Sequence, residues 1–363
     1  MTEKKTDKGV TRHAADTPRE AALTRRTFIG SASAAIAAGA SVGTFSIIGR
    51  AQAAASGTVT MYTSMPTSYS APVAAAFNKL GKGITVNVFY APTYQALQRL
   101  EAELKANRVL CDIFLIADPG PFLNLKARKE LLDYVSPEAK HYGKADRDKD
   151  GLWVNGRTVA TMFAYNNTKL GAKDAPKTWQ EFADAKWTGK LGGIDPRVGG
   201  TGYSWYYVTR NTPSLGVKWW EKLAKTKMLL TRGHGALMDR MVSGELPVTE
   251  QLDYAVYINI KKKKAPITAV YPPEITPVTI APIAVIKRGP NNAAAKVFYD
   301  WWLSKAGQEV VRDIGGVYSA RKDVAPLAGK PAYDTLKVMD IDYESYLKDR
   351  KKLTAEFVKV FGL

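Results

Sequence analysis

The sequence predicts two α/β lobes that are joined by two extended crossover strands, with a ligand cleft between the lobes. Three observations predict this fold class. Residues 58–116 alternate strand and helix patterns, residues 190–262 repeat this alternation, and long extended segments at residues 157–166 and 276–286 separate the patterns. Strands that alternate with helices indicate βαβ units and a largely parallel sheet. Two lobes connected by two strands can close on a ligand by a hinge motion.

The first lobe is expected to open with a strand at residues 58–63, because this segment is rich in β-branched residues. Leu97, Leu100 and Leu104 form the apolar stripe of a helix. The elements expected here are strands at residues 58–63, 84–90 and 111–116, and helices at residues 71–80 and 94–107.

The second lobe repeats the alternation between the two extended segments. Its expected strands are residues 190–194, 228–230 and 246–249, and its expected helices are residues 203–210, 217–225, 235–242 and 251–262. Helices at residues 293–304 and 307–314 then follow the second crossover. These assignments place the first lobe at residues 54–160 plus 280–363 and the second lobe at residues 161–279.

The N-terminal segment is expected to be a removable export signal and not part of the fold. Arg25 and Arg26 precede Phe28, a charge-free run rich in Ala, Gly and Ser extends to Gly49, and Ala51 and Ala53 fit a cleavage site. The paired arginines are typical of twin-arginine export, which would carry a folded protein to the periplasm. An N-terminal membrane anchor is the alternative, although spanning helices favour Leu, Ile, Val and Phe over these small residues. Residues 1–53 are therefore assigned to a cleavable signal.

The charge of the chain favours an anionic partner. Residues 1–53 hold eight Lys and Arg against four Asp and Glu, so +14 of the formal net charge of +18 remains on the rest of the chain. The run of four lysines at residues 261–264 is interpreted as a solvated helix end. Cys111 is the only cysteine, so no intrachain disulfide can form, and its apolar neighbours predict a buried structural thiol.

Short motifs distributed over about three hundred residues resemble extracellular solute-binding proteins of family 1, in the branch of ferric-iron and organophosphate binders. The order and spacing of the motifs carry the resemblance. The motifs are Tyr62-Thr63-Ser64, Asp112-Ile113-Phe114, Asp118-Pro119-Gly120, Ala164-Tyr165-Asn166-Asn167-Thr168, Pro176-Lys177-Thr178-Trp179, Trp187-Thr188-Gly189-Lys190-Leu191, Asp195-Pro196, Ser243-Gly244-Glu245, Tyr271-Pro272-Pro273-Glu274 and Ser304-Lys305-Ala306-Gly307-Gln308. The resemblance implies a type II periplasmic binding protein that delivers a solute to the membrane permease of an ABC importer. It does not identify the solute.

Ligands of doubly wound sheets bind beyond the carboxyl ends of the strands, which places four loops at the cleft. The first loop offers four hydroxyls before a helix, whereas capping that helix would need only one. The second loop is rich in glycine, which lets the backbone approach a ligand, although an ordinary glycine turn with a Thr cap is the alternative. The contacts expected from these two loops are Ser64, Thr67, Ser68, Tyr69, Gly200, Thr201, Gly202 and Tyr203.

The third loop contains Arg232 and His234 at an expected helix start. His234 could bind an anion when protonated or a metal when neutral, or could simply cap or pack. Only His141 accompanies it outside the N-terminal segment, so a His-cluster metal site is not available.

The fourth loop contains Asp253 and Tyr254. The resemblance implies two adjacent tyrosines at about this point in ferric binders, but here Tyr254 is followed by Ala255. A ferric site would then use Tyr254 and Asp253, with Tyr203 or Tyr62 as further candidates. The positive charge favours an organic anion instead, which one or two arginines would bind; the candidates are Arg157, Arg197 and Arg232.

These observations predict a monomeric binding protein for a small anionic solute, namely a phosphate ester, a phosphonate or a carboxylate. Iron(III) as the transported ligand is the alternative, and no cofactor is expected. A less favoured class is an exported hydrolase, but beyond the expected signal at residues 1–53 the sequence has neither a G-x-S-x-G nor an H-E-x-x-H motif. A third class is a basic adhesion protein that acts through its surface charge. Such a function would not require the two crossover strands. Nucleic acid is not expected as a partner of an exported protein.

Overall fold

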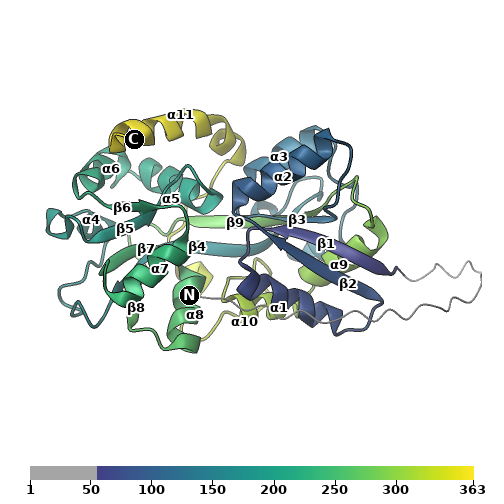
Figure 1. Ribbon diagram of the computed structural model, residues 1–363, viewed down its shortest axis with the longest axis horizontal. Helices are drawn as coiled ribbons and strands as arrows, with labels where there is room; N and C mark the ends of the chain where they lie inside the picture. The colour runs from purple at the N-terminus through teal and green to yellow at the C-terminus, as the bar shows by residue number, and fades with distance from the viewer. Residues whose placement is uncertain (1–54) are drawn as a thin grey trace, which may run out of the picture. The chain divides into compact units, whose positions relative to one another are not determined.

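A computed structural model describes residues 55–363 and contains one mixed sheet flanked by helices (Figure 1). Within these residues the sheet has nine strands in the order β2-β1-β3-β9-β4-β7-β5-β6, and β8 pairs with β4. The expected export signal lies outside the described residues. No helix of the described part combines the length and the apolarity that crossing a membrane would require.

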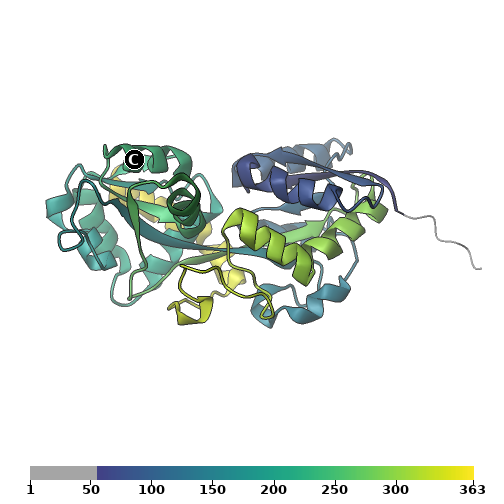
Figure 2. The same cartoon turned by 90° about the horizontal axis from the view of Figure 1, so that it is seen from below.

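One end of the sheet is built from residues near both ends of the described chain. Strands β1 to β3 pair in parallel, and β9 pairs with β3 in the antiparallel sense. Helices α1 and α10 contact each other, and α9 packs on β1 and β9 (Figure 2). The elements are β1 Gly57–Thr63, α1 Thr67–Asn78, β2 Ile84–Tyr90, α2 Thr93–Lys105, β3 Ile113–Leu115, α3 Gly120–Ala127, β9 Val278–Val285, α9 Asn292–Leu303 and α10 Lys305–Gly315. This end is the first lobe.

The other end of the sheet holds the intervening residues and forms the second lobe. Strands β5, β6 and β7 pair in parallel around β5. A cluster of aromatic side chains fills its core, including Trp179, Trp205 and Trp220. The elements are α4 Trp179–Phe182, β5 Leu191–Ile194, α5 Gly200–Asn211, α6 Gly216–Lys225, β6 Leu229–Thr231, α7 His234–Ser243, β7 Val248–Leu252, α8 Asp253–Lys263, β8 Ile267–Val270 and α11 Tyr343–Phe361.

Two long buried strands connect the lobes, as the sequence predicts. Strand β4, Val154–Asn166, runs antiparallel to β9 and continues into the second lobe, where it pairs with β7 and β8 (Figure 1). Every residue of both strands is buried, which explains why their sequences show no polar alternation. The two lobes joined by two crossover strands are the fold of a type II periplasmic binding protein.

The C-terminal helix α11 departs from the expected lobe boundaries. Its buried residues Tyr346, Leu353 and Phe357 belong to the core cluster of the second lobe, although residues 280–363 were assigned to the first lobe. The helix also contacts α3 of the first lobe. Its apolar residues follow helical spacing and Asp342 caps its first turn, so the sequence carried a signal for this helix.

Two smaller expectations are met. Cys111 is fully buried and free. Lysines 261–264 are exposed at the end of α8, where positive charge complements the helix dipole.

Candidate functional site

A cavity of about 310 Å³ lies where the lobes meet, on one face of the crossover strands. The first lobe contributes Ser64, Ser68 and Tyr69, the second lobe contributes Thr201, Arg232, His234 and Tyr254, and crossover strand β4 contributes Arg157. Seven of the eleven residues expected to contact a ligand from the four loops thus line one cavity. We call this cavity the solute pocket.

Four helices begin at the solute pocket without a side-chain cap. Each is preceded by a Pro or a Gly, which offers no side-chain oxygen to the first amides, so those amides depend on another partner. Each helix N-terminus also carries a partial positive charge. The four starts are Thr67 of α1 after Pro66, Thr93 of α2 after Pro92, Gly200 of α5 after Gly199, and His234 of α7 after Gly233. The hydroxyls of the first loop are therefore not used to cap α1, and the arrangement suits an anion.

Arg157 brings a buried positive charge to the floor of the solute pocket. A β-bulge at Gly156 shifts the register of β4 against β9 between Asn155 and Arg157, and bulges of this kind re-aim side chains. Arg157 is only 2% exposed, and its Nε and Nη1 are buried without a hydrogen-bond partner. Burial lowers the pKa of this guanidinium. A buried charge is costly unless it is paired, so this position suits a negatively charged group of a ligand.

Asp253 lies near Arg157 but does not form an ion pair with it. Its Oδ1 accepts a hydrogen bond of 3.0 Å from the Ala160 amide, and its Oδ2 accepts one from Lys330. Asp253 does not line the solute pocket, and its side chain is fully buried. The structure does not bring the expected ferric pair of Tyr254 and Asp253 together in the solute pocket, because Asp253 lies outside the lining and is engaged with Lys330.

Three tyrosines line the solute pocket around Arg157. Tyr254 packs edge-on against Tyr69 with ring centroids 5.6 Å apart, and the Arg157 guanidinium lies 5.8 Å from the Tyr254 ring. The third is Tyr90, at the end of β2. Burial raises the pKa of Tyr254 to about 12, although the charge of Arg157 lowers it, and burial also raises the pKa of Tyr69. Both phenols are therefore neutral hydrogen-bond donors at neutral pH.

His234 has a fixed orientation at the start of α7. Its Nε2 lies 3.0 Å from Oε1 of the fully buried Glu250, whose Oε2 accepts the Ile194 amide at 3.0 Å. The contact with Glu250 fixes the orientation of the imidazole through Nε2, and Nδ1 takes no part in this contact.

Other expected residues lie beside the solute pocket and do not line it. Tyr203 is 1% exposed and turns to the far side of α5, where its hydroxyl donates to the Tyr346 carbonyl and its ring lies 4.5 Å from the Arg350 guanidinium. Thr67 and Gly202 are also absent from its lining. Arg197 is paired with Asp195 at 2.7 Å and is not available to a ligand there. Helical rotation explains why Thr67, Gly202 and Tyr203 do not line the pocket, because successive residues of one turn face different sides of the helix.

Gly200 has a structural role in place of an expected ligand contact. A Cβ at this position would lie 1.9 Å from the Ala117 carbonyl oxygen of the first lobe. Only glycine permits the start of α5 to approach the other lobe this closely. Gly199 and Thr201, on either side, do line the solute pocket.

The sequence interpretation missed part of the lining contributed by the first lobe. Tyr90 ends β2, and Pro92 and Thr93 follow it in the same way as Pro66 and Thr67 follow β1. The repeated strand-Pro-Thr-helix pattern was the available signal. Further lining residues that were not expected are Ala117, Asp239, Asn259 and Lys263.

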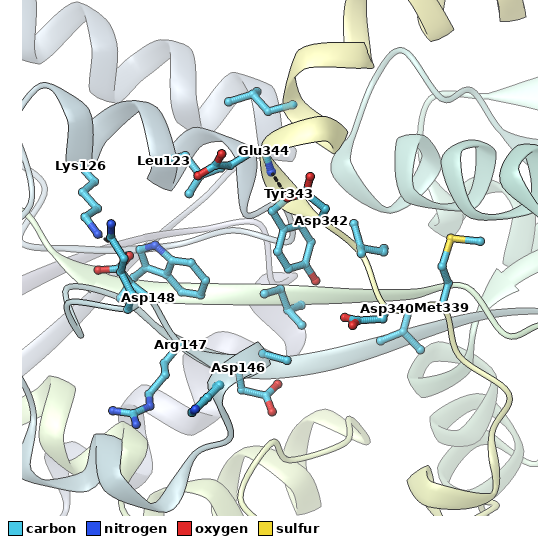
Figure 3. Close-up of a pocket in the computed structure, with 18 of the residues that line it drawn as sticks. Leu123, Lys126, Asp146, Arg147, Asp148, Met339, Asp340, Asp342, Tyr343 and Glu344 are labelled. Atoms are coloured by element: carbon cyan, nitrogen blue, oxygen red, sulfur yellow. Dashed lines mark hydrogen bonds and ion pairs between the residues drawn. The ribbon is translucent and has the colours of Figure 1, made fainter.

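A larger cavity of about 1260 Å³ lies on the opposite face of the crossover strands (Figure 3). Val278 and Ile280 line it, whereas Val159, which lines the solute pocket, pairs with the intervening Thr279. Five acidic and five basic side chains surround the larger cavity, and Lys126 and Asp148 are paired at 2.6 Å. Its charges balance, so it shows no preference for an ion. Among residues 55–363, no cluster of His, Cys, Asp and Glu could hold a metal.

Comparisons with known proteins agree with this geometry. The family model for bacterial extracellular solute-binding proteins matches residues 73–337. The chain belongs to this family. An uncharacterized protein of Haemophilus influenzae is 25% identical to this solute-binding protein over 286 residues, which are 71% of this chain and 78% of that protein.

Solved periplasmic binding proteins share its fold. One is AfuA from Actinobacillus pleuropneumoniae with fructose-6-phosphate bound, at a TM-score of 0.75 and 22% identity over 84% of this chain and 98% of that chain. Another is iron-bound HitA from Pseudomonas aeruginosa, at a TM-score of 0.71 and 20% identity over 84% of this chain and 99% of that chain. At these identities the likeness establishes the fold and leaves the solute open.

Proposed function

We propose that this solute-binding protein captures a small anionic solute in the periplasm and delivers it to the permease of an ABC importer. The solute is a phosphate ester, a phosphonate or a carboxylate. The observation that carries this proposal is the buried guanidinium of Arg157, whose Nε and Nη1 have no hydrogen-bond partner, in a cavity at which four uncapped helices begin. An anion there would gain charge-assisted hydrogen bonds from Arg157 and from amides that have no other side-chain partner.

The size and lining of the solute pocket limit the solute. A volume of about 310 Å³ is at the lower end of ordinary ligand pockets, so the solute is small. Arg157, Arg232 and Lys263 outnumber the single carboxylate of Asp239 in the lining, which favours a dianion over a monoanion. Tyr69 and Tyr254 offer neutral hydroxyls and ring faces to the uncharged part of the solute.

A second candidate is iron(III) held together with an anion. The observation that favours it is the group of Tyr69, Tyr90 and Tyr254 in one cavity, because phenolate oxygens suit a ferric ion. The raised pKa values of Tyr69 and Tyr254 oppose it, since each ligand would have to lose its proton on binding. HitA was solved with iron and AfuA with a sugar phosphate, so the fold accepts both kinds of ligand.

The remaining assignments belong to the same proposal. The protein binds its solute without chemical conversion, acts as a monomer, and reaches the periplasm through a cleavable twin-arginine signal in residues 1–53. The first lobe consists of residues 54–160 and 280–315, and the second of residues 161–279. Helix α11 is attached to the second lobe because Tyr346, Leu353 and Phe357 pack in its core.

The experiment that tests the proposal is a thermal-shift screen followed by calorimetry. The probes are inorganic phosphate, fructose 6-phosphate, succinate and ferric citrate, each with the parent protein and with Tyr254→Phe. A bound solute stabilises the folded state by roughly 2.7 kcal/mol at a hundredfold excess over Kd. We expect an organic or inorganic anion to bind both proteins, with Tyr254→Phe losing at most about tenfold in affinity, which is one hydrogen bond.

The ferric alternative makes the opposite prediction. Iron bound to phenolate would give a visible charge-transfer band with ferric citrate, and Tyr254→Phe would remove it. A band that Tyr254→Phe abolishes, together with no response to the three iron-free anions, would replace the anion assignment by iron(III).

A further inference from the structure

An ion-pair cluster around the buried Asp118 joins the two lobes outside the solute pocket. Arg350 of α11 donates from Nη1 to the Tyr94 hydroxyl at 2.7 Å and from Nη2 to Asp118 Oδ1 at 2.9 Å. The same Nη1 lies 2.7 Å from Asp118 Oδ2, which also accepts the Tyr94 hydroxyl at 3.0 Å. Asp118 is completely buried. We call these three residues the Arg350 cluster.

The members of the cluster belong to different lobes. Asp118 follows β3, and Tyr94 lies on α2, both in the first lobe. Arg350 comes from α11, whose buried residues Tyr346 and Phe357 pack in the core of the second lobe. The guanidinium also lies 4.5 Å from the Tyr203 ring of α5. A movement of one lobe relative to the other would therefore separate Arg350 from Asp118.

A short chain of contacts connects the cluster to the solute pocket. Ala117, the residue before Asp118, lines the pocket and donates its amide to Ser64 Oγ at 3.0 Å. The carbonyl of Ala117 is the atom that meets Gly200 at the start of α5. Ala117 thus contacts Ser64 of the pocket and lies close to the start of α5, and it is bonded directly to Asp118, the partner of Arg350.

We propose that Arg350 is a positioning residue that latches the lobes in the closed arrangement and so controls retention of the solute. The inference rests on the proposed function, because it assigns a regulator to that same pocket. Arg350 does not line the pocket, so it acts through Asp118 and Ala117. The sequence analysis did not predict the contact between Arg350 and Asp118.

The chemistry of the pair explains why it suits a reversible latch. In the open arrangement water would solvate both Arg350 and Asp118, so each charge is accommodated there. On closure the two charges lose water together, and the two-pronged geometry with the Tyr94 hydroxyl compensates that loss. The pair therefore adds little to the free energy of folding of either lobe. Its effect falls on the rate at which the lobes separate and release solute.

The test measures lobe closure and solute release in Arg350→Gln, Asp118→Asn and the double variant. Labels at Lys82→Cys and Lys173→Cys, which are exposed on the first and second lobes, report the interlobe distance, and the buried Cys111 does not compete for label. The probes are inorganic phosphate and fructose 6-phosphate. We expect each single variant to raise Kd about tenfold to a hundredfold, the value of one charged hydrogen bond, through faster dissociation. The double variant should lose no more than the singles because they remove one shared contact.

The matched control is Arg210→Gln. Arg210 pairs with Glu356 of α11 at 2.9 Å, but this pair joins α5 to α11 within the second lobe. We expect the control to keep the parent's dissociation rate and interlobe distance. Equal dissociation rates and equal closed populations in Arg350→Gln and Arg210→Gln would overturn the latch. If the parent protein binds neither probe, the proposed function fails for phosphate compounds. The latch is then tested by the interlobe distance without solute: a smaller closed population in Arg350→Gln than in Arg210→Gln supports it, and equal populations overturn it.

Discussion

Replacing Arg157 by Met should affect solute binding and stability in opposite directions. Arg157 presents two buried donors, Nε and Nη1, without hydrogen-bond partners among the described residues. Each hydrogen bond to a charged solute is worth about 1.5–3 kcal/mol, so their loss should cost about 3–6 kcal/mol of binding free energy, or roughly 10²–10⁴ in Kd. The free protein should unfold at an equal or higher denaturant concentration, with a gain of about 1–3 kcal/mol, because the unpaired buried charge is gone.

Calorimetry with the strongest anion of the screen and urea unfolding of the free protein measure both effects. Arg197→Met is the matched control, because it removes the same charge from an exposed position that is paired with Asp195. The control should bind normally, which separates the local role of Arg157 from the general effect of net charge. Unchanged affinity in Arg157→Met would refute the anion site. A free protein destabilised by several kcal/mol would show instead that Arg157 has a structural partner.

Three further outcomes are expected from the site and the export signal. Ser64→Ala and Thr201→Ala should each raise Kd about tenfold to a hundredfold in calorimetry, and unaltered affinity in both would remove the hydroxyls from the site. In thermal unfolding, Thr201→Ala should keep the parent's melting temperature, whereas Ser64→Ala should lower it because the Ala117 amide loses its acceptor. Gly200→Ala should lower the affinity, because the new methyl would lie 1.9 Å from the Ala117 carbonyl oxygen and would keep the lobes from meeting as they do in the structure; small-angle scattering with saturating solute should then show no contraction. Replacing Arg25 and Arg26 by Lys should retain precursor in the cytoplasm, and normal export would indicate the general secretory route.

Local patterns were sufficient to predict most of the fold. The two crossovers were recognisable because a long run without helical periodicity stands out between alternating segments. The structure places β9 within the second expected segment, and β4 covers the first but starts three residues earlier, at Val154. Helix α11 was not predicted, although Tyr346, Leu353 and Phe357 have helical spacing. Its assignment to a lobe depends on the core of Trp220 and Tyr206, which is a long-range contact that no local pattern contains.

The candidate site was predictable to the level of loops but not of side chains. Strand ends bring Ser64, Thr201 and His234 to one cavity, as expected for carboxyl ends of a sheet. The direction of Tyr203 depends on the rotation of α5, and the pairing of Asp253 with Lys330 spans 77 residues of sequence. The importance of Arg157 arises from a bulge and from missing partners, and these are properties of the assembled structure.

The route of the chain through the sheet also determines when folding can finish during synthesis. The core that contains Val59 and Met61 is completed by side chains as late as Val317, and the core that contains Phe163 is completed only by Phe357. Neither lobe can close its core on the ribosome until almost the whole chain has emerged, because domains fold only when their contacts are available. A chain shortened at its C-terminus would therefore leave the second lobe without Tyr346, Leu353 and Phe357, even though that lobe's own strands and helices lie far upstream.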